Sequence, residues 1–159
     1  MGFTEPQAKA RLDSLLSRPR NNNDFEPRLV MFGCKRSALT AMAGAPRPHE
    51  PIDLVIAPVP CGGRIDEALV LKTLGSGADG IIMAVCHEDN CRTQTGSLAA
   101  NRRAAHLKKI LAKIGCKPER LTLVTLAPNM GGEFSREVLG FRAAMKELGP
   151  NPMAGTYHD

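Results

Sequence analysis

The sequence is poor in aromatic residues and lacks long apolar or basic runs. Its 159 residues include no Trp, one Tyr and five Phe, too few for a module that stacks single-stranded bases on aromatic rings. No run of about 18 apolar residues is present, so no membrane-spanning helix is expected. The net charge is +5, but the basic residues are spread along the chain. This distribution favours an acidic protein partner over nucleic acid.

The N-terminus also lacks the basic and then apolar pattern of a secretory signal, which predicts a cytoplasmic location. Cysteines in that compartment are normally reduced. The chain has five of them, and an odd number argues against a closed disulfide framework. A chain of this length buries a sizeable core without such crosslinks. Clustered cysteines are therefore expected to bind a metal or to take part in redox chemistry.

Short apolar runs alternate with amphipathic stretches along most of the chain. The runs predict four buried strands, at residues 28–33, 53–58, 80–85 and 121–126. Helical periodicity and capping residues predict helices at residues 37–43, 66–75, 98–114 and 134–148. Repeated strand–helix units are typical of the α/β class. We expect a single domain with a four-stranded parallel sheet and helices on both faces.

Composition divides the chain into three segments. Residues 4–17 predict a short helix capped by Thr4, and a polar stretch separates it from the first strand. Residues 1–27 are therefore expected to form an N-terminal helical extension and linker, residues 28–150 the α/β domain, and residues 151–159 a flexible tail. The extension either packs on its own domain or docks a partner protein, and the sequence leaves both open.

Four cysteines follow predicted strands. Cys34 and Cys61 come after the first two strands, and Cys86 and Cys91 share the loop after the third. The carboxyl ends of parallel strands meet at one edge of the sheet, where α/β proteins place their sites. Cys116 precedes the fourth strand, at the opposite edge, and is expected to be structural.

Four converging thiolates suit zinc or an iron–sulfur cluster, because thiolate is a soft, anionic ligand. The position of the cysteines carries this prediction, since the sequence contains no Cys-x-x-Cys. Two other readings stay open. The cysteines are scattered buried residues without a ligand, or the chain is a thiol redox enzyme that uses a low-pKa thiol such as Cys34.

Other residues near these cysteines suggest further roles. The glycine pairs at residues 62–63 and 131–132 precede helices and resemble anion-binding turns, but neither matches a nucleotide-binding fingerprint. His87 is expected beside the ligands or in solvent. Three basic side chains are expected to offset the charge of a thiolate-bound cluster or to dock an acidic partner: Arg64, Arg92 and Arg102.

Several short motifs resemble the delta subunit family of methyl-viologen-reducing hydrogenase. They are residues 59–66 around Cys61, residues 77–80, Cys86-His87 with Cys91 five residues on, and residues 118–121 and 147–150. The resemblance runs from about residue 28 to residue 150. It implies a small α/β subunit that carries one [2Fe-2S] cluster. It also implies electron transfer between a donor, such as hydrogenase or formate dehydrogenase, and the flavoprotein subunit of heterodisulfide-reductase-like complexes.

The family further implies anaerobic complexes that carry out flavin-based electron bifurcation, including the tungsten-containing class of benzoyl-CoA reductase. Family members usually carry a Cys-x-x-Cys after the first strand, whereas here Cys34 is followed by Ser37. The four remaining cysteines match the number that a [2Fe-2S] cluster needs: Cys34, Cys61, Cys86 and Cys91. Ser37 and His87 are alternative ligands. The departure favours a complex other than a hydrogenase.

These observations predict a non-catalytic electron-transfer subunit of an oxidoreductase complex. Its [2Fe-2S] cluster would relay electrons to or from a heterodisulfide-reductase-A-like subunit that carries flavin and iron–sulfur groups. The alternative is an interaction module in which the same four cysteines hold a structural zinc ion.

Overall fold

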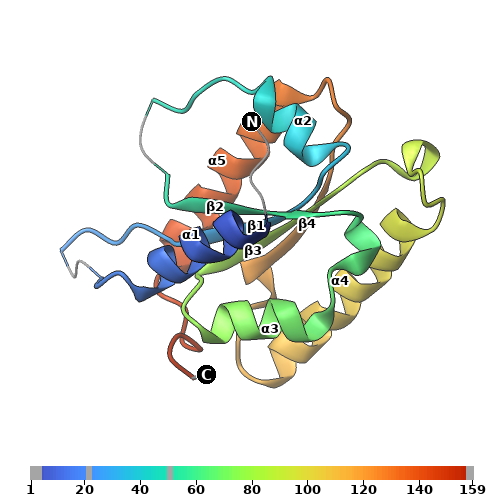
Figure 1. Cartoon of the computed structure of the whole chain (residues 1–159). Helices are drawn as coiled ribbons and strands as arrows, with labels where there is room; N and C mark the ends of the chain where they lie inside the picture. The colour runs from blue at the N-terminus through green and yellow to red at the C-terminus, as the bar shows by residue number, and fades with distance from the viewer. Residues whose placement is uncertain (1–4, 21–22, 50–51, 157–159) are drawn as a thin grey trace.

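A four-stranded parallel sheet forms the centre of the molecule (Figure 1). The computed structural model describes residues 5–20, 23–49 and 52–156. The strand order is β2-β1-β3-β4, and every neighbouring pair is parallel. The strands are β1 (Leu29–Cys34), β2 (Leu54–Val59), β3 (Gly80–Val85) and β4 (Leu121–Thr125). The predicted α/β fold is confirmed, and each strand lies within one residue of its predicted bounds.

Helices cover both faces of this sheet (Figure 1). They are α1 (Glu5–Ser17), α2 (Ala38–Ala43), α3 (Glu67–Gly75), α4 (Gly96–Lys113) and α5 (Gly131–Leu148). Three short 3-10 turns lie between them: η1 (Gly62–Arg64), η2 (Glu88–Asn90) and η3 (Pro118–Arg120). Thr4, the predicted cap of the first helix, lies outside the described residues. None of the described helices is long and apolar enough to cross a membrane.

The alternation of side chains along the strands produces two cores. Val30 and Phe32 belong to the core that α3 and α4 cover, whereas Leu29 and Met31 belong to the core that α2 and α5 cover. The central strands β1 and β3 are buried along their whole length. Burial on both faces explains why these strands read as continuous apolar runs in the sequence.

The N-terminal helix packs on its own domain. Ala8 and Leu15 of α1 are buried, and Leu12 and Leu16 contact the core on the α3 side of the sheet. The helix lies in front of β2 in Figure 1, and it contacts that strand. The sequence left open whether the extension packs on its own domain or docks a partner protein. In the structure, α1 packs on its own domain.

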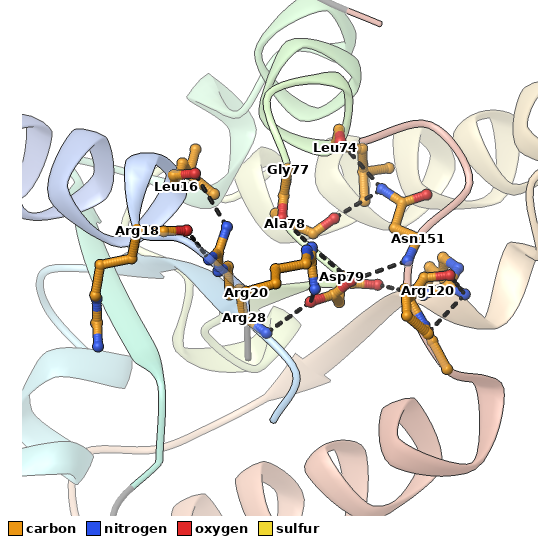
Figure 2. Close-up of polar contacts among 12 residues, drawn as sticks. Leu16, Arg18, Arg20, Arg28, Leu74, Gly77, Ala78, Asp79, Arg120 and Asn151 are labelled. Atoms are coloured by element: carbon orange, nitrogen blue, oxygen red, sulfur yellow. Dashed lines mark hydrogen bonds and ion pairs between the residues drawn. The ribbon is translucent and has the colours of Figure 1, made fainter. Parts of the chain in front are cut away.

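A buried carboxylate connects the extension to the amino edge of the sheet. Asp79, directly before β3, is 0% exposed. Arg20 donates to both of its carboxylate oxygens, at 3.0 and 3.1 Å, and the backbone N–H groups of Arg28 and Asn151 donate at 2.9 Å (Figure 2). Asn151, the first residue of the predicted tail, is itself buried. Asp79 therefore joins three segments that are far apart in the sequence: the segment of Arg20 and Arg28, the start of β3 and the segment after α5.

Two buried arginines extend this network, which we call the amino-edge network: Arg20, Arg28, Asp79, Arg120 and Asn151. The guanidinium of Arg120 donates to the carbonyl oxygens of Asp79, Gly149 and Pro150 at 3.0 Å. That of Arg28 donates to the carbonyl oxygens of Leu16 and Arg18. Three of the motifs that resemble the hydrogenase subunit family, residues 77–80, 118–121 and 147–150, meet here and not at the cysteines.

Candidate metal centre

Cys34 and Cys86 lie where the strand order changes direction. The chain passes from β1 to β2 on one side and then returns to place β3 on the other side of β1. Open parallel sheets bind ligands in the crevice outside the carboxyl ends of two such strands. Cys34 is the last residue of β1 and Cys86 directly follows β3, with exposed fractions of 1% and 8%. The sheet therefore holds these two thiols side by side.

All four predicted ligands line one pocket at this edge. The pocket has a volume of about 390 Å³, and its lining is Cys34, Arg36, Pro60, Cys61, Arg64, Cys86, Cys91, Arg92 and Thr93. Cys34, Cys86 and Cys91 form one buried cluster, while Cys61 is partly exposed. None of the five cysteines forms a disulfide. Cys116 lies between α4 and β4, at the opposite edge, with its sulfur 3.9 Å from Asn151 Oδ1.

Two glycines allow the loops of Cys61 and Cys91 to approach each other. A Cβ atom on Gly63 would lie 3.0 Å from the Cα of Gly96. A Cβ atom on Gly96 would lie 2.3 Å from the sulfur of Cys61 and 2.4 Å from Thr93 Oγ1. Real side chains do not approach so closely, so a larger residue at position 96 would displace the thiol.

The first turns of α4 hold the cysteine loops in place. Ser97, which is 3% exposed, donates from its hydroxyl to the carbonyl oxygen of Cys86 at 2.6 Å. Arg103 donates to the carbonyl oxygens of Gly63 and Ile65, in and just after η1, the turn that follows Cys61. The sequence predicts this helix from residue 98, whereas it begins at Gly96. Gly96 and Ser97 were therefore not identified as site residues, and Arg103, which lies inside the predicted helix, was missed as well.

The environment separates the acidities of the neighbouring thiols. Burial raises the pKa of Cys86 to about 12, with further contributions from Cys34 and Cys91. Burial also acts against ionisation of Cys91, but hydrogen bonds from the Thr93 hydroxyl and from backbone N–H groups at Ser97 and Thr93 lower its pKa to about 7. Thiols bind metal as thiolates, so metal binding at this pocket would release protons.

The donor set fits an iron–sulfur cluster. Four cysteines are the usual ligands of a [2Fe-2S] cluster, and N–H groups at the start of a helix favour the negative charge of bound thiolates. Within the described residues, no group of three or more His, Cys, Asp or Glu side chains is arranged to hold a single metal ion.

Other candidates from the sequence occupy different places. His87 directly precedes η2 and is partly exposed, outside the residues that line the pocket. Ser37 is 2% exposed, and its hydroxyl has no hydrogen-bond partner among the described residues. Arg64 and Arg92 line the pocket, as does Arg36, whereas Arg102 is exposed on α4.

Thr93 is a further residue at the pocket that sequence reasoning missed. Its hydroxyl oxygen lies 3.1 Å from the sulfur of Cys61 and 3.3 Å from that of Cys91. A threonine three residues before a glycine reads as an ordinary turn. Its position two residues after Cys91 and close to a helix start was the available signal, because Thr commonly caps helices.

Comparison of this chain with known proteins identifies the family to which it is similar. Residues 29–149 match the model of the methyl-viologen-reducing hydrogenase delta subunit. The iron-sulfur subunit of the F420-non-reducing hydrogenase of Archaeoglobus profundus is 33% identical over 131 residues, which cover 81% of this chain and 96% of that protein. The corresponding vhu iron-sulfur subunit of Methanococcus maripaludis is 31% identical over 130 residues, 80% of this chain and 97% of that protein.

A second kind of relative is much longer. The A-subunit of the ferredoxin:CoB-CoM heterodisulfide reductase of Methanosarcina mazei is 32% identical over 126 residues, which cover 78% of this chain but only 16% of that protein. The family match begins at residue 29, so α1 and the linker lie outside it. Over the sheet, the helices that cover it and the pocket with its four cysteines, this chain belongs to the methyl-viologen-reducing hydrogenase delta subunit family.

Proposed function

We propose that this chain is an electron-transfer subunit that holds one [2Fe-2S] cluster through Cys34, Cys61, Cys86 and Cys91. The observation that carries the proposal is the meeting of these four thiols, from three separate segments of the chain, at one pocket. The relatives are named as iron-sulfur subunits, which supports an iron–sulfur group. The number of thiols supports the [2Fe-2S] type.

The cluster supplies a centre that takes up and returns one electron. The chain supplies its environment. The burial of Cys34 and Cys86 excludes water from one side, and the start of α4 directs N–H groups toward the other. Hydrogen bonds and solvent exposure set the reduction potential of such centres. Cys61 is the least buried of the four, so electrons would exchange with a partner on its side.

As that partner we further propose a heterodisulfide-reductase-A-like flavin and iron–sulfur subunit. In the Methanosarcina mazei relative, a segment similar to this chain is part of the heterodisulfide reductase polypeptide itself. Segments that are fused in one protein commonly act together when they are separate chains. The complex would be an anaerobic, electron-bifurcating oxidoreductase in the cytoplasm, either hydrogenase-linked or of the benzoyl-CoA reductase type.

Three arginines give the partner a surface to recognise. Arg36, Arg64 and Arg92 are exposed and line the pocket beside the cysteines. In the described part of the chain, none of the three is paired with a carboxylate. We call them the arginine rim. A rim of this sign would steer an acidic partner surface to the pocket, and it would offset the negative charge of a thiolate-bound cluster.

Anaerobic iron and acid-labile sulfide analysis of the purified chain tests the proposal, together with an EPR spectrum after dithionite reduction. We expect about two irons and two sulfides per chain and the signal of a spin-half [2Fe-2S] centre. Zinc without sulfide would contradict the electron-transfer role and indicate a structural zinc module.

Affinity purification of the tagged chain from its native cells under anaerobic conditions tests the proposed partner. Recovery of the tagged chain by itself would contradict the proposed complex.

A further inference from the structure

We propose that Thr93 is a positioning residue whose hydroxyl bridges the sulfur atoms of Cys61 and Cys91 and raises the reduction potential of the cluster, an inference that rests on the proposed function. Its Oγ1 atom lies 3.1 Å from one sulfur and 3.3 Å from the other. Cys91 is two residues away in the chain, whereas Cys61 belongs to a different loop. One hydroxyl thus links the two loops that bring their thiols to the pocket.

The hydrogen-bond pattern around Thr93 directs its proton toward sulfur. The N–H of Gly96 donates to Oγ1 at 3.2 Å. A hydroxyl has one proton and two lone pairs, so this contact uses an acceptor site and leaves the proton free for a sulfur atom. The sulfurs of Cys61 and Cys91 lie within reach of that proton as acceptors. A hydrogen bond to an ionised thiolate is stronger than one to a neutral thiol.

The backbone keeps the hydroxyl in this place. The N–H of Gln94 donates to the carbonyl oxygen of Cys91 at 2.8 Å, which closes a turn around Thr93. The N–H of Thr95 donates to the carbonyl oxygen of Thr93 at 2.6 Å. Gly96 leaves no spare room on the other side, because a Cβ there would lie 2.4 Å from Oγ1. The hydroxyl is thus held by its own turn and by the start of α4.

The charge of the cluster determines whether a hydrogen bond from Thr93 raises or lowers its reduction potential. Reduction adds one negative charge that is shared with the thiolate ligands. A donor at the sulfur atoms therefore stabilises the reduced state more than the oxidised state, which raises the potential. The single proton of Thr93 would perform this task at one sulfur atom at a time, that of Cys61 or that of Cys91, because the hydroxyl reaches both.

The test compares Thr93→Val, which keeps the shape and removes the hydroxyl, with Thr93→Ser, which keeps the hydroxyl. EPR-monitored titration of the cluster-loaded chain measures the midpoint potential. We expect a shift to lower potential in the valine variant and a value close to that of the unmodified chain in the serine variant. Thr95→Val is the matched control, because the Thr95 hydroxyl donates to the Thr93 carbonyl oxygen at 3.4 Å and not to a sulfur atom of the site.

Two further readouts separate a hydrogen bond from a general structural effect. In deuterium-exchanged samples, pulsed EPR should detect an exchangeable coupling to the reduced cluster that Thr93→Val loses and Thr93→Ser retains. Iron and sulfide are measured in every variant. Reduced loading in Thr93→Val with normal loading in Thr93→Ser would support the bridging role, because the serine variant retains the hydroxyl.

The remaining outcomes overturn the inference. An unchanged potential and an unchanged coupling in a fully loaded Thr93→Val variant would contradict it and leave the proposed function intact. Equal shifts, or equal losses of the cluster, in the valine and serine variants would also contradict it, since the hydroxyl would then not be the cause. Absence of iron and sulfide from the unmodified chain would refute the proposed function first, and the inference with it.

Discussion

The two edges of the sheet treat charge in opposite ways. At the amino edge, the carboxylate of Asp79 accepts hydrogen bonds from Arg20, Arg28 and Asn151 within the chain. One nitrogen of that network, Arg120 Nε, lacks a partner among the described residues. At the carboxyl edge, four thiols meet beside the arginine rim, and no carboxylate of the described chain pairs with that rim. The charges at the amino edge therefore stabilise the fold through contacts within the chain. The thiols and arginines at the carboxyl edge are instead suited to binding a ligand or a partner protein.

Removing the carboxylate of the amino-edge network should have the largest effect on stability. Asp79→Ala leaves the Arg20 guanidinium and the buried N–H groups of Arg28 and Asn151 without their acceptor, and losing one partner of a buried ion pair typically costs about 3 to 5 kcal/mol of unfolding free energy. Urea denaturation measures this loss. Asp53→Ala is the control, because its ion pair with Arg18 is solvent-accessible on both sides and should contribute no more than about 1 kcal/mol. A similar loss of unfolding free energy in Asp79→Ala and Asp53→Ala would show that the amino-edge network does not stabilise the fold more than an ordinary surface ion pair.

A side chain at the start of α4 should damage the carboxyl edge selectively. Gly96→Ala places a Cβ atom 2.3 Å from the sulfur of Cys61, so Cys61 must move. We expect most of the iron and sulfide to be lost, with a decrease in unfolding free energy of about 1 to 3 kcal/mol from overpacking. Gly140→Ala in α5 is the matched control, since its Cβ meets nothing within 4 Å. Full cluster content in Gly96→Ala would show that the glycine does not shape the site.

Reversing the charge of the arginine rim should weaken docking and leave the fold intact. Arg64→Glu should slow association with the co-purified flavoprotein by about tenfold at low salt, because long-range steering depends on charge. Stopped-flow measurements at two ionic strengths test this, and the difference should shrink at high salt. Arg136→Glu on α5, outside the pocket lining, is the control. Equal rates for both variants would assign the rim another role.

Substitution of Ser37 should have the smallest effect on stability, and it tests whether Ser37 is a ligand of the cluster. Its buried hydroxyl has no partner among the described residues, so Ser37→Ala should change the unfolding free energy by no more than about 1 kcal/mol. Iron content and the reduced-state EPR spectrum should remain those of the unmodified chain. Loss of iron, or a changed spectrum, would instead make Ser37 a ligand in the place of the family's second cysteine. Ser37→Cys then serves as the matching gain-of-ligand variant.

The sheet and the placement of the cysteines were predictable from the sequence because both follow from local rules. Buried parallel strands read as apolar runs, and right-handed strand–helix units bring their carboxyl ends to one edge. Cys34, Cys61, Cys86 and Cys91 therefore share an edge without any knowledge of distant contacts. The role of these four as ligands stays a prediction.

Distant contacts and ambiguous local patterns explain what the sequence did not predict. Asp79 meets Arg20 and Asn151 across 59 and 72 residues, and no periodicity encodes such pairs. The start of α4 at Gly96 was also missed, because Thr93 to Ser97 has the composition of a turn. In α3, the apolar residues Ala68 and Val70 differ in burial, since Ala68 is exposed and Val70 is buried. That helix is so rich in apolar residues that its periodicity does not define one face.

Iron content per folded chain in five single Cys→Ser variants tests the location of the cluster most directly. We predict loss of iron, or a labile centre, in Cys34→Ser, Cys61→Ser, Cys86→Ser and Cys91→Ser, and full retention in Cys116→Ser. Circular dichroism confirms that each variant folds. Retention of a stable cluster in Cys61→Ser together with its loss in Cys116→Ser would contradict the assignment of the site to the carboxyl edge of the sheet.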